Sequence, residues 1–246
     1  MTAASRLANI PPVTLGLAFV GIGALSILHR DFALTWQPFP EAMAGREVWG
    51  LASGVVAILA GALTALPRTR ALGAMALAVF TGLWVLALHG PIVADAPSNV
   101  GAWNGFAESL ALCMGAVGVW RGVQSGAGDA PTAWAIRAIG CACLIFGLAH
   151  FTYDELTASM IPAWLPLRLE LAWLTGAIHA LCGLAMLIGY RPRTAAALEG
   201  LMMLSFVALV HVPRVAAKPT DRLELTMLCM AVALTSSAFA LATSRR

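Results

Sequence analysis

The chain has 246 residues, of which 60% are hydrophobic and 11% are charged, with a formal net charge of +3 and a mean hydropathy of +0.83. A soluble domain of this length could not bury so much apolar surface. The composition therefore excludes a soluble globular protein and indicates a protein of the lipid bilayer, and we expect no nucleic-acid partner.

Eight runs are long and apolar enough to be membrane-spanning helices, which need about 20 mostly apolar residues. We therefore expect an all-α integral membrane protein with eight transmembrane helices. The runs centre on residues 13–29, 48–66, 71–89, 106–120, 132–150, 169–188, 194–211 and 223–242.

The second half of the chain repeats the first. The phrase His-x-Pro-(x)5-Pro begins at His89 and again at His211, each time at the end of an apolar run. Four helices per repeat is an even number, so the two copies should run parallel. We predict two tandem four-helix bundles, residues 1–122 and 132–246, joined by a linker over 123–131. Spacings of 121 or 122 residues separate His29 from His150, Arg46 from Arg168, Gly54 from Gly176 and Pro91 from Pro213.

The prolines of the repeated phrase predict where two helices end, because an internal proline removes a helical hydrogen bond. The five residues 101–105, which only the first half carries, should lie in a loop. Arginine is more frequent on the side of the termini, which favours cytoplasmic termini in a bacterial inner membrane. The helix-ending histidines then lie at the outer edge of the membrane.

Charged and titratable side chains gather at that outer edge. Imidazole beside guanidinium and carboxylate could hydrogen-bond the oxygens of a quinone and exchange protons with it. The alternative is that these histidines only cap helix ends. The candidates for ligand binding or proton handling are His29, His89, His150, His179, His211, Arg46, Arg168, Glu108 and Glu224.

Some of these residues have further interpretations. Glu108 and Glu224 should open the fourth and eighth helices as favourable N-terminal charges, with Arg46 and Arg168 free to pair with them, with lipid headgroups or with an anionic substrate. His179 lies in the middle of a helix, where it should make a buried hydrogen bond between helices or an asymmetric site.

The sequence does not predict a metal site. No two histidines are four residues apart, and Cys141 and Cys143 should point to nearly opposite faces of one helix. Haem is not expected either, because the chain has no Cys-x-x-Cys-His motif and the histidines lie at helix ends.

The stretches LAHFTYDELTASMIPAWLP and WLTGAIHALCGLAMLIGYRPRTAAALEGLMMLSFVALVHVPR resemble the DoxX-like family of integral membrane proteins. The resemblance covers nearly all of residues 136–240, while the first half is more divergent, with Ala57 in the place of His179. It implies a redox-linked membrane subunit with quinone as acceptor. His150, Pro162 and His211 are among the positions that match the family's pattern.

We therefore expect a redox-associated subunit that binds a quinone or another lipophilic ligand near the outer membrane edge and works with a redox partner protein. Two alternatives stay open. One is a noncatalytic scaffold with structural histidines, and the other is a small-molecule carrier or transporter, which predicts a cavity reaching the midplane near His179 and Glu199. No catalytic residue is assigned.

Overall fold

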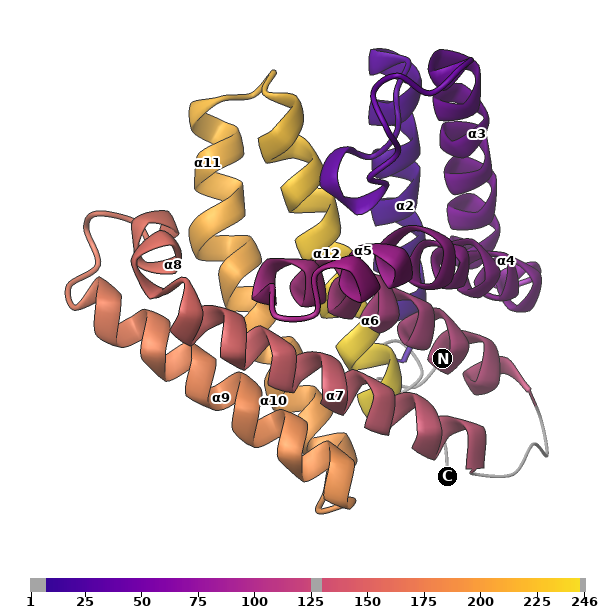
Figure 1. The fold of residues 1–246 in the computed structure, drawn as a ribbon. Helices are drawn as coiled ribbons and strands as arrows, with labels where there is room; N and C mark the ends of the chain where they lie inside the picture. The colour runs from indigo at the N-terminus through magenta and orange to yellow at the C-terminus, as the bar shows by residue number, and fades with distance from the viewer. Residues whose placement is uncertain (1–7, 125–129, 244–246) are drawn as a thin grey trace.

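A computed structural model of the chain describes residues 8–124 and 130–243, and the regular structure in these ranges is helical (Figure 1). Within them, eight helices are long and apolar enough to cross a membrane, which confirms the predicted multi-pass fold. The elements are α2 (Ile10–His29), η1 (Leu34–Trp36), α3 (Arg46–Ala65), α4 (Arg70–Leu83), η2 (Trp84–His89), α5 (Gly90–Asp95), α6 (Val100–Val123), α7 (Ala130–Thr152), α8 (Asp154–Met160), α9 (Arg168–Ile188), α10 (Pro192–Phe206), η3 (Val207–His211), α11 (Val212–Ala217) and α12 (Arg222–Ala242).

Each half begins with two helices whose backbones touch: α2 packs on α3, and α7 packs on α9. A Cβ atom added to Gly61 would lie 2.5 Å from the carbonyl oxygen of Gly16, and one added to Gly183 would lie 2.7 Å from that of Gly140. Only glycine permits so close an approach of two helices.

These contacts also show how α2 corresponds to α7. Gly16 meets α3 where Gly140 meets α9, so corresponding residues of the two helices are 124 apart. His150 therefore occupies the place of Ser26, and His29 lies almost one helical turn further along. The predicted equivalence of His29 and His150, which rested on a spacing of 121, was wrong.

The last transmembrane helix of each half packs against the first helix of the other half. α6 contacts α7, α12 contacts α2, and α6 and α12 contact each other (Figure 1). The two predicted halves are thus not separate bundles, because α6 and α12 each pack against both halves. Of the predicted linker, residues 125–129 lie outside the described residues.

The first proline of each repeated phrase does not end its helix, which corrects the prediction. The chain widens into the π-helical turns η2 and η3 just before Pro91 and Pro213, then continues as α5 and α11. A π turn accommodates the missing N–H and the bulk of the proline ring without breaking the helix. Helix α5 ends only before Pro97, and α11 before Pro219, because a proline disfavours the α-helical conformation in the residue that precedes it. His89 and His211 therefore lie inside their spans.

Candidate functional site

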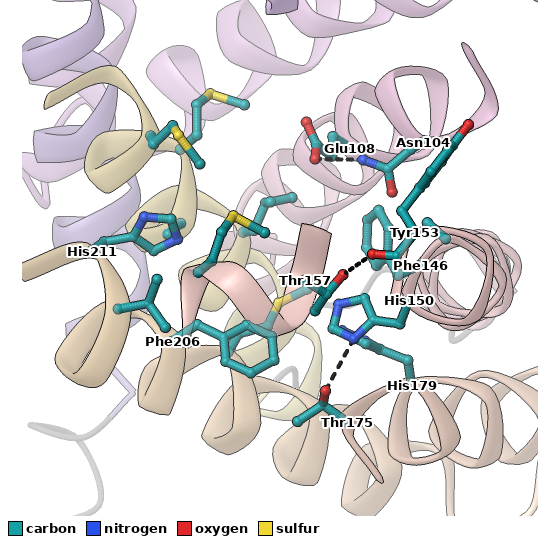
Figure 2. A pocket seen from close by; sticks show the side chains of 18 of the residues that line it. Asn104, Glu108, Phe146, His150, Tyr153, Thr157, Thr175, His179, Phe206 and His211 are labelled. Atoms are coloured by element: carbon teal, nitrogen blue, oxygen red, sulfur yellow. Dashed lines mark hydrogen bonds between the residues drawn. The ribbon is translucent and has the colours of Figure 1, made fainter. Parts of the chain in front are cut away.

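A cavity of about 540 Å³ lies within the second half of the chain, and α6 and η1 of the first half complete its wall. Most of its lining surface is apolar, including four methionines and Phe206, and polar side chains from α6, α7, α8, α9 and η3 interrupt it. The cavity brings together four of the predicted site residues, which come from four different elements and point toward a common space in Figure 2: Glu108, His150, His179 and His211.

His150 faces the cavity from the last turn of α7. Its Nδ1 atom lies 3.0 Å from the Thr175 hydroxyl oxygen and 3.4 Å from the carbonyl oxygen of Ala172. The Thr175 hydroxyl donates its own hydrogen to a backbone carbonyl, that of Leu171 at 2.9 Å or that of Ala172 at 3.0 Å. The Ala172 carbonyl can only accept, so the arrangement favours a hydrogen on Nδ1, which leaves Nε2 of the neutral ring as a hydrogen-bond acceptor.

His179 is only 2% exposed and makes a buried hydrogen bond between helices, one of the two interpretations of this residue. Its Nδ1 atom lies 2.6 Å from Oε1 of Glu199 on α10, and its ring lies edge-on to His150 with 4.9 Å between the centroids. The Glu199 side chain is fully buried, and its Oε2 atom has no hydrogen-bond partner. This unpaired oxygen is unusual because burying a polar atom without a partner costs free energy.

His211 reaches the cavity from η3, and its Nδ1 atom is also buried without a hydrogen-bond partner. One turn further on, Arg214 makes two hydrogen bonds to Glu224, at 2.7 and 2.8 Å. Glu224 lies in the first turn of α12, as predicted, but its partner is this arginine rather than Arg46 or Arg168.

Glu108 was expected at the start of its helix, and this was wrong. α6 begins at Val100, because the residues 101–105 that were predicted as a loop are helical and Asn99 caps the helix through its side chain. Glu108 consequently lies eight residues into the helix at the cavity wall. It accepts a hydrogen bond from Asn104 at 2.9 Å and another from the indole N–H of Trp36.

The remaining predicted candidates lie outside the cavity. His29 is exposed at the end of α2, and Arg168 is exposed at the start of α9. His89 is 4% exposed, and its Nε2 atom donates to the carbonyl oxygen of Trp36 at 3.1 Å, which makes it a structural residue of the first half.

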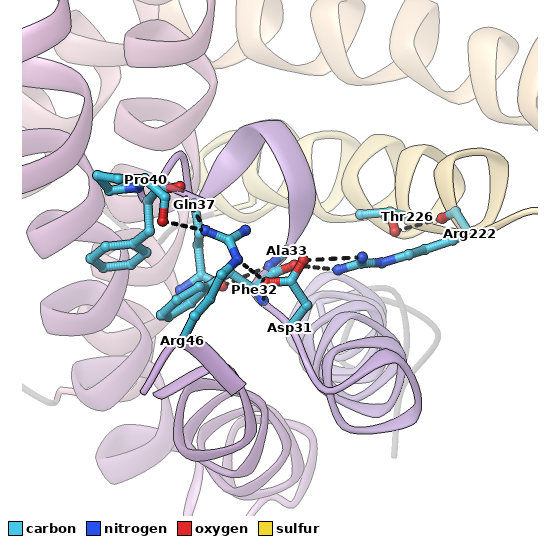
Figure 3. Close-up of polar contacts among 9 residues, drawn as sticks. Asp31, Phe32, Ala33, Gln37, Pro40, Arg46, Arg222 and Thr226 are labelled. Atoms are coloured by element: carbon cyan, nitrogen blue, oxygen red, sulfur yellow. Dashed lines mark hydrogen bonds and ion pairs between the residues drawn. The ribbon is translucent and has the colours of Figure 1, made fainter. Parts of the chain in front are cut away.

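Arg46 takes part in a separate network at the end of α2 (Figure 3). Its Nε atom lies 2.8 Å from Asp31, and Arg222 of α12 reaches the other oxygen of that carboxylate at 3.3 Å. Partial burial would raise the pKa of Asp31, but hydrogen bonds from Arg46, the backbone N–H of Phe32 and Arg222 outweigh burial and lower the pKa. This network ties the first half to α12 and leaves Arg46 no role in the cavity.

Two features of the candidate site could not be predicted from the sequence. Trp36 reads as an interfacial tryptophan, yet it is 8% exposed and hydrogen-bonds Glu108. The side chains of Cys143, His179 and Glu199 lie on three helices, yet their ligand atoms all lie within 4.8 Å of one another. Residue spacing cannot reveal such a group, because it depends on how the helices pack.

No protein-family model, curated protein or solved structure matches this chain. Its similarity to DoxX-like proteins stays a prediction, and function has to be inferred from the geometry of the cavity. That cavity can hold an apolar molecule, offer it one lone pair at His150, and place an imidazole and a carboxylate near its polar atoms.

Proposed function

We propose that the protein is a redox-associated membrane subunit, of the DoxX-like kind, that binds a quinone-class ligand in this cavity. The observation that carries the proposal is the orientation of His150. Its Nδ1 atom is committed to Thr175, so its Nε2 atom is left as an acceptor at an apolar cavity wall. A quinol hydroxyl is the complementary donor.

The volume and lining support a ligand of this class. Small-molecule cavities in proteins hold roughly 300–1,000 Å³ and combine apolar walls with a few polar groups that fix orientation. At about 540 Å³ the cavity falls in this range, with Phe206 and methionines for the ring and chain of the ligand. His211 lines the same cavity and can bind a second ligand oxygen.

The histidine also gives the proposed ligand a place to leave a proton. When a quinol gives two electrons to a redox partner protein, it releases two protons. Nε2 of His150 accepts the proton of the hydroxyl that it holds, and the unpartnered Nδ1 of His211 in the same cavity can accept the proton of the second hydroxyl. The quinol form should consequently bind more tightly than the quinone, which has no hydrogen to donate.

The membrane setting follows the sequence prediction. With both termini in the cytoplasm of a bacterium, the cavity would lie toward the outer leaflet of the inner membrane, with α8 forming part of its wall. A quinol diffusing in the bilayer would then reach His150 without leaving the apolar phase.

A second candidate, a carrier of small lipophilic molecules, is favoured by the depth of the cavity. Its lining includes His179, near the middle of α9, and Leu234, near the middle of α12. A carrier would move its ligand across the membrane with no change in oxidation state.

Equilibrium binding of decyl-ubiquinol and decyl-ubiquinone to the detergent-purified protein tests the proposal. We expect saturable binding with a lower Kd for the quinol. His150→Leu keeps the volume but removes the acceptor, and should raise the quinol Kd by about tenfold, the equivalent of one hydrogen bond.

His29→Leu is the matched control, because His29 is exposed at a helix end away from the cavity, and its Kd should equal that of the unaltered protein. An absence of saturable binding, or equal Kd values for the two histidine variants, contradicts the proposal. Flux of unaltered ligand across proteoliposomes would favour the carrier.

A further inference from the structure

Behind the cavity, three potential metal ligands converge from three helices. Cys143 of α7, His179 of α9 and Glu199 of α10 are all buried, and one ligand atom of each lies within 4.8 Å of the others. Among the described residues this is the group of histidine, cysteine and acidic side chains that is close enough to hold a metal ion. We propose that it binds a divalent transition-metal ion, with Zn²⁺ the best match.

The donor atoms support this choice. Zn²⁺ accepts thiolate sulfur, imidazole nitrogen and carboxylate oxygen, and sites with three protein ligands keep a fourth position for water or substrate. Hard cations such as Mg²⁺ and Ca²⁺ take only oxygen ligands, so the thiol and the imidazole exclude them.

Charge balance favours a divalent ion at this depth. A Zn²⁺ ion bound by the Cys143 thiolate, the Glu199 carboxylate and a neutral His179 forms a site with no net charge. A neutral site avoids most of the cost of burying charge in the interior of a membrane protein. A monovalent ion would leave a net negative charge on the same ligands.

The unpaired oxygen of Glu199 is an independent indication. Its side chain is 0% exposed, and Oε2 has no hydrogen-bond partner although Oε1 is bound by His179. A carboxylate that served only to orient His179 would leave Oε2 with no better partner than the weak donor of the Cys143 thiol. A metal ion beside the carboxylate would satisfy it.

The fit requires only a small adjustment. Bonds of about 2.0–2.2 Å in a tetrahedral site place nitrogen and oxygen ligands roughly 3.4 Å apart, compared with 2.6 Å between His179 and Glu199. Rotation of the Glu199 side chain can open this gap. Of the three ligands only His179 also lines the cavity, so the group lies behind the cavity wall and shares one side chain with it.

Metal binding can be measured directly on the purified, chelator-treated chain. We expect one Zn²⁺ per chain in equilibrium dialysis and, with Co²⁺, a thiolate-to-metal charge-transfer band. Loss of an outer-shell partner weakens metal binding by roughly 10–100-fold, and loss of a direct ligand should weaken it at least as much. Cys143→Ser and Glu199→Gln should therefore each raise the Kd for Zn²⁺ by at least that factor.

Cys141→Ser is the matched control, because Cys141 is exposed two residues away on the same helix and should keep both the stoichiometry and the charge-transfer band. Size-exclusion profiles identify any variant that has not folded, and the Co²⁺ band of the unaltered protein reports thiolate coordination without any substitution. Absence of both Zn²⁺ binding and that band in the unaltered protein, or equal binding by folded Cys143→Ser, would overturn the proposal.

Discussion

The two halves of the chain share one framework but differ in what it encloses. Glycines bring α2 against α3 and α7 against α9 in the same way. The places of Cys143, His179 and Glu199 correspond in the first half to Phe19, Ala57 and Leu77, which are 0%, 2% and 0% exposed. Helix packing at these places is thus satisfied by apolar side chains, which shows that the buried polar group of the second half is not a requirement of the framework.

The histidines of the repeated phrase show the same contrast. His89 donates to the carbonyl oxygen of Trp36, and the first half is closed at that point. His211 has an unpartnered Nδ1 atom at the wall of the cavity. One histidine is used for structure and the other is left available to a ligand.

The largest expected effect tests what the halves have in common. Gly61→Val and Gly183→Val each force side-chain atoms against a backbone carbonyl, and should lower the free energy of unfolding by about 2–3 kcal/mol. Thermal unfolding in detergent would measure both. Gly122→Val is the control, since a Cβ there meets nothing within 4 Å. If only one of the two substitutions lowered the stability, the two halves would not share this mode of helix packing.

The contrast between His89 and His211 predicts smaller losses of stability, which should differ between the two histidines. His89→Ala removes a buried hydrogen-bond donor and leaves a void, and should cost about 2 kcal/mol of stability. His211→Ala removes a ring nitrogen that has no partner, and should cost under about 1 kcal/mol while weakening binding of the proposed quinol. Unfolding free energies and quinol titrations of the two variants give the comparison, and a larger stability loss for His211→Ala would contradict it.

The smallest effect concerns pH. The pKa of Asp31 is lower in the folded protein than the ordinary aspartate value near 4. Its ion pairs therefore stabilise the fold at pH values above about 4, and this stabilisation is lost as the pH falls through the folded pKa. With partly exposed partners, Asp31→Asn should cost about 1 kcal/mol at pH 7. Between pH 7 and 3, the free energy of unfolding should depend less steeply on pH in this variant than in the unaltered protein. Glu155 is an exposed acid of α8, and Glu155→Gln should leave that pH dependence unchanged. Equal slopes for both variants would contradict this account.

Hydropathy predicted the eight spans because each helix has to be apolar along its length to cross a bilayer. It could not predict the π turns, since whether a proline ends a helix depends on the local hydrogen bonding that neighbouring helices support. His150, His179 and His211 could be predicted as candidates from their residue type. Glu199 entered only as a marker of the carrier alternative, and Cys143 was considered only with Cys141, as a pair that predicts no metal site, because only tertiary packing reveals what these side chains face.

The exchange of inner helices between the halves has a consequence for how such a chain arises and assembles. Since α6 needs α7 and α12 needs α2, a single half would expose the faces that the other half covers. Two separate copies of an ancestral four-helix unit could cover one another by the same contacts, as an intertwined homodimer. Gene fusion would then have allowed one copy to keep an apolar interior while the other acquired buried polar side chains, and the two fragments expressed separately should still recombine in the membrane.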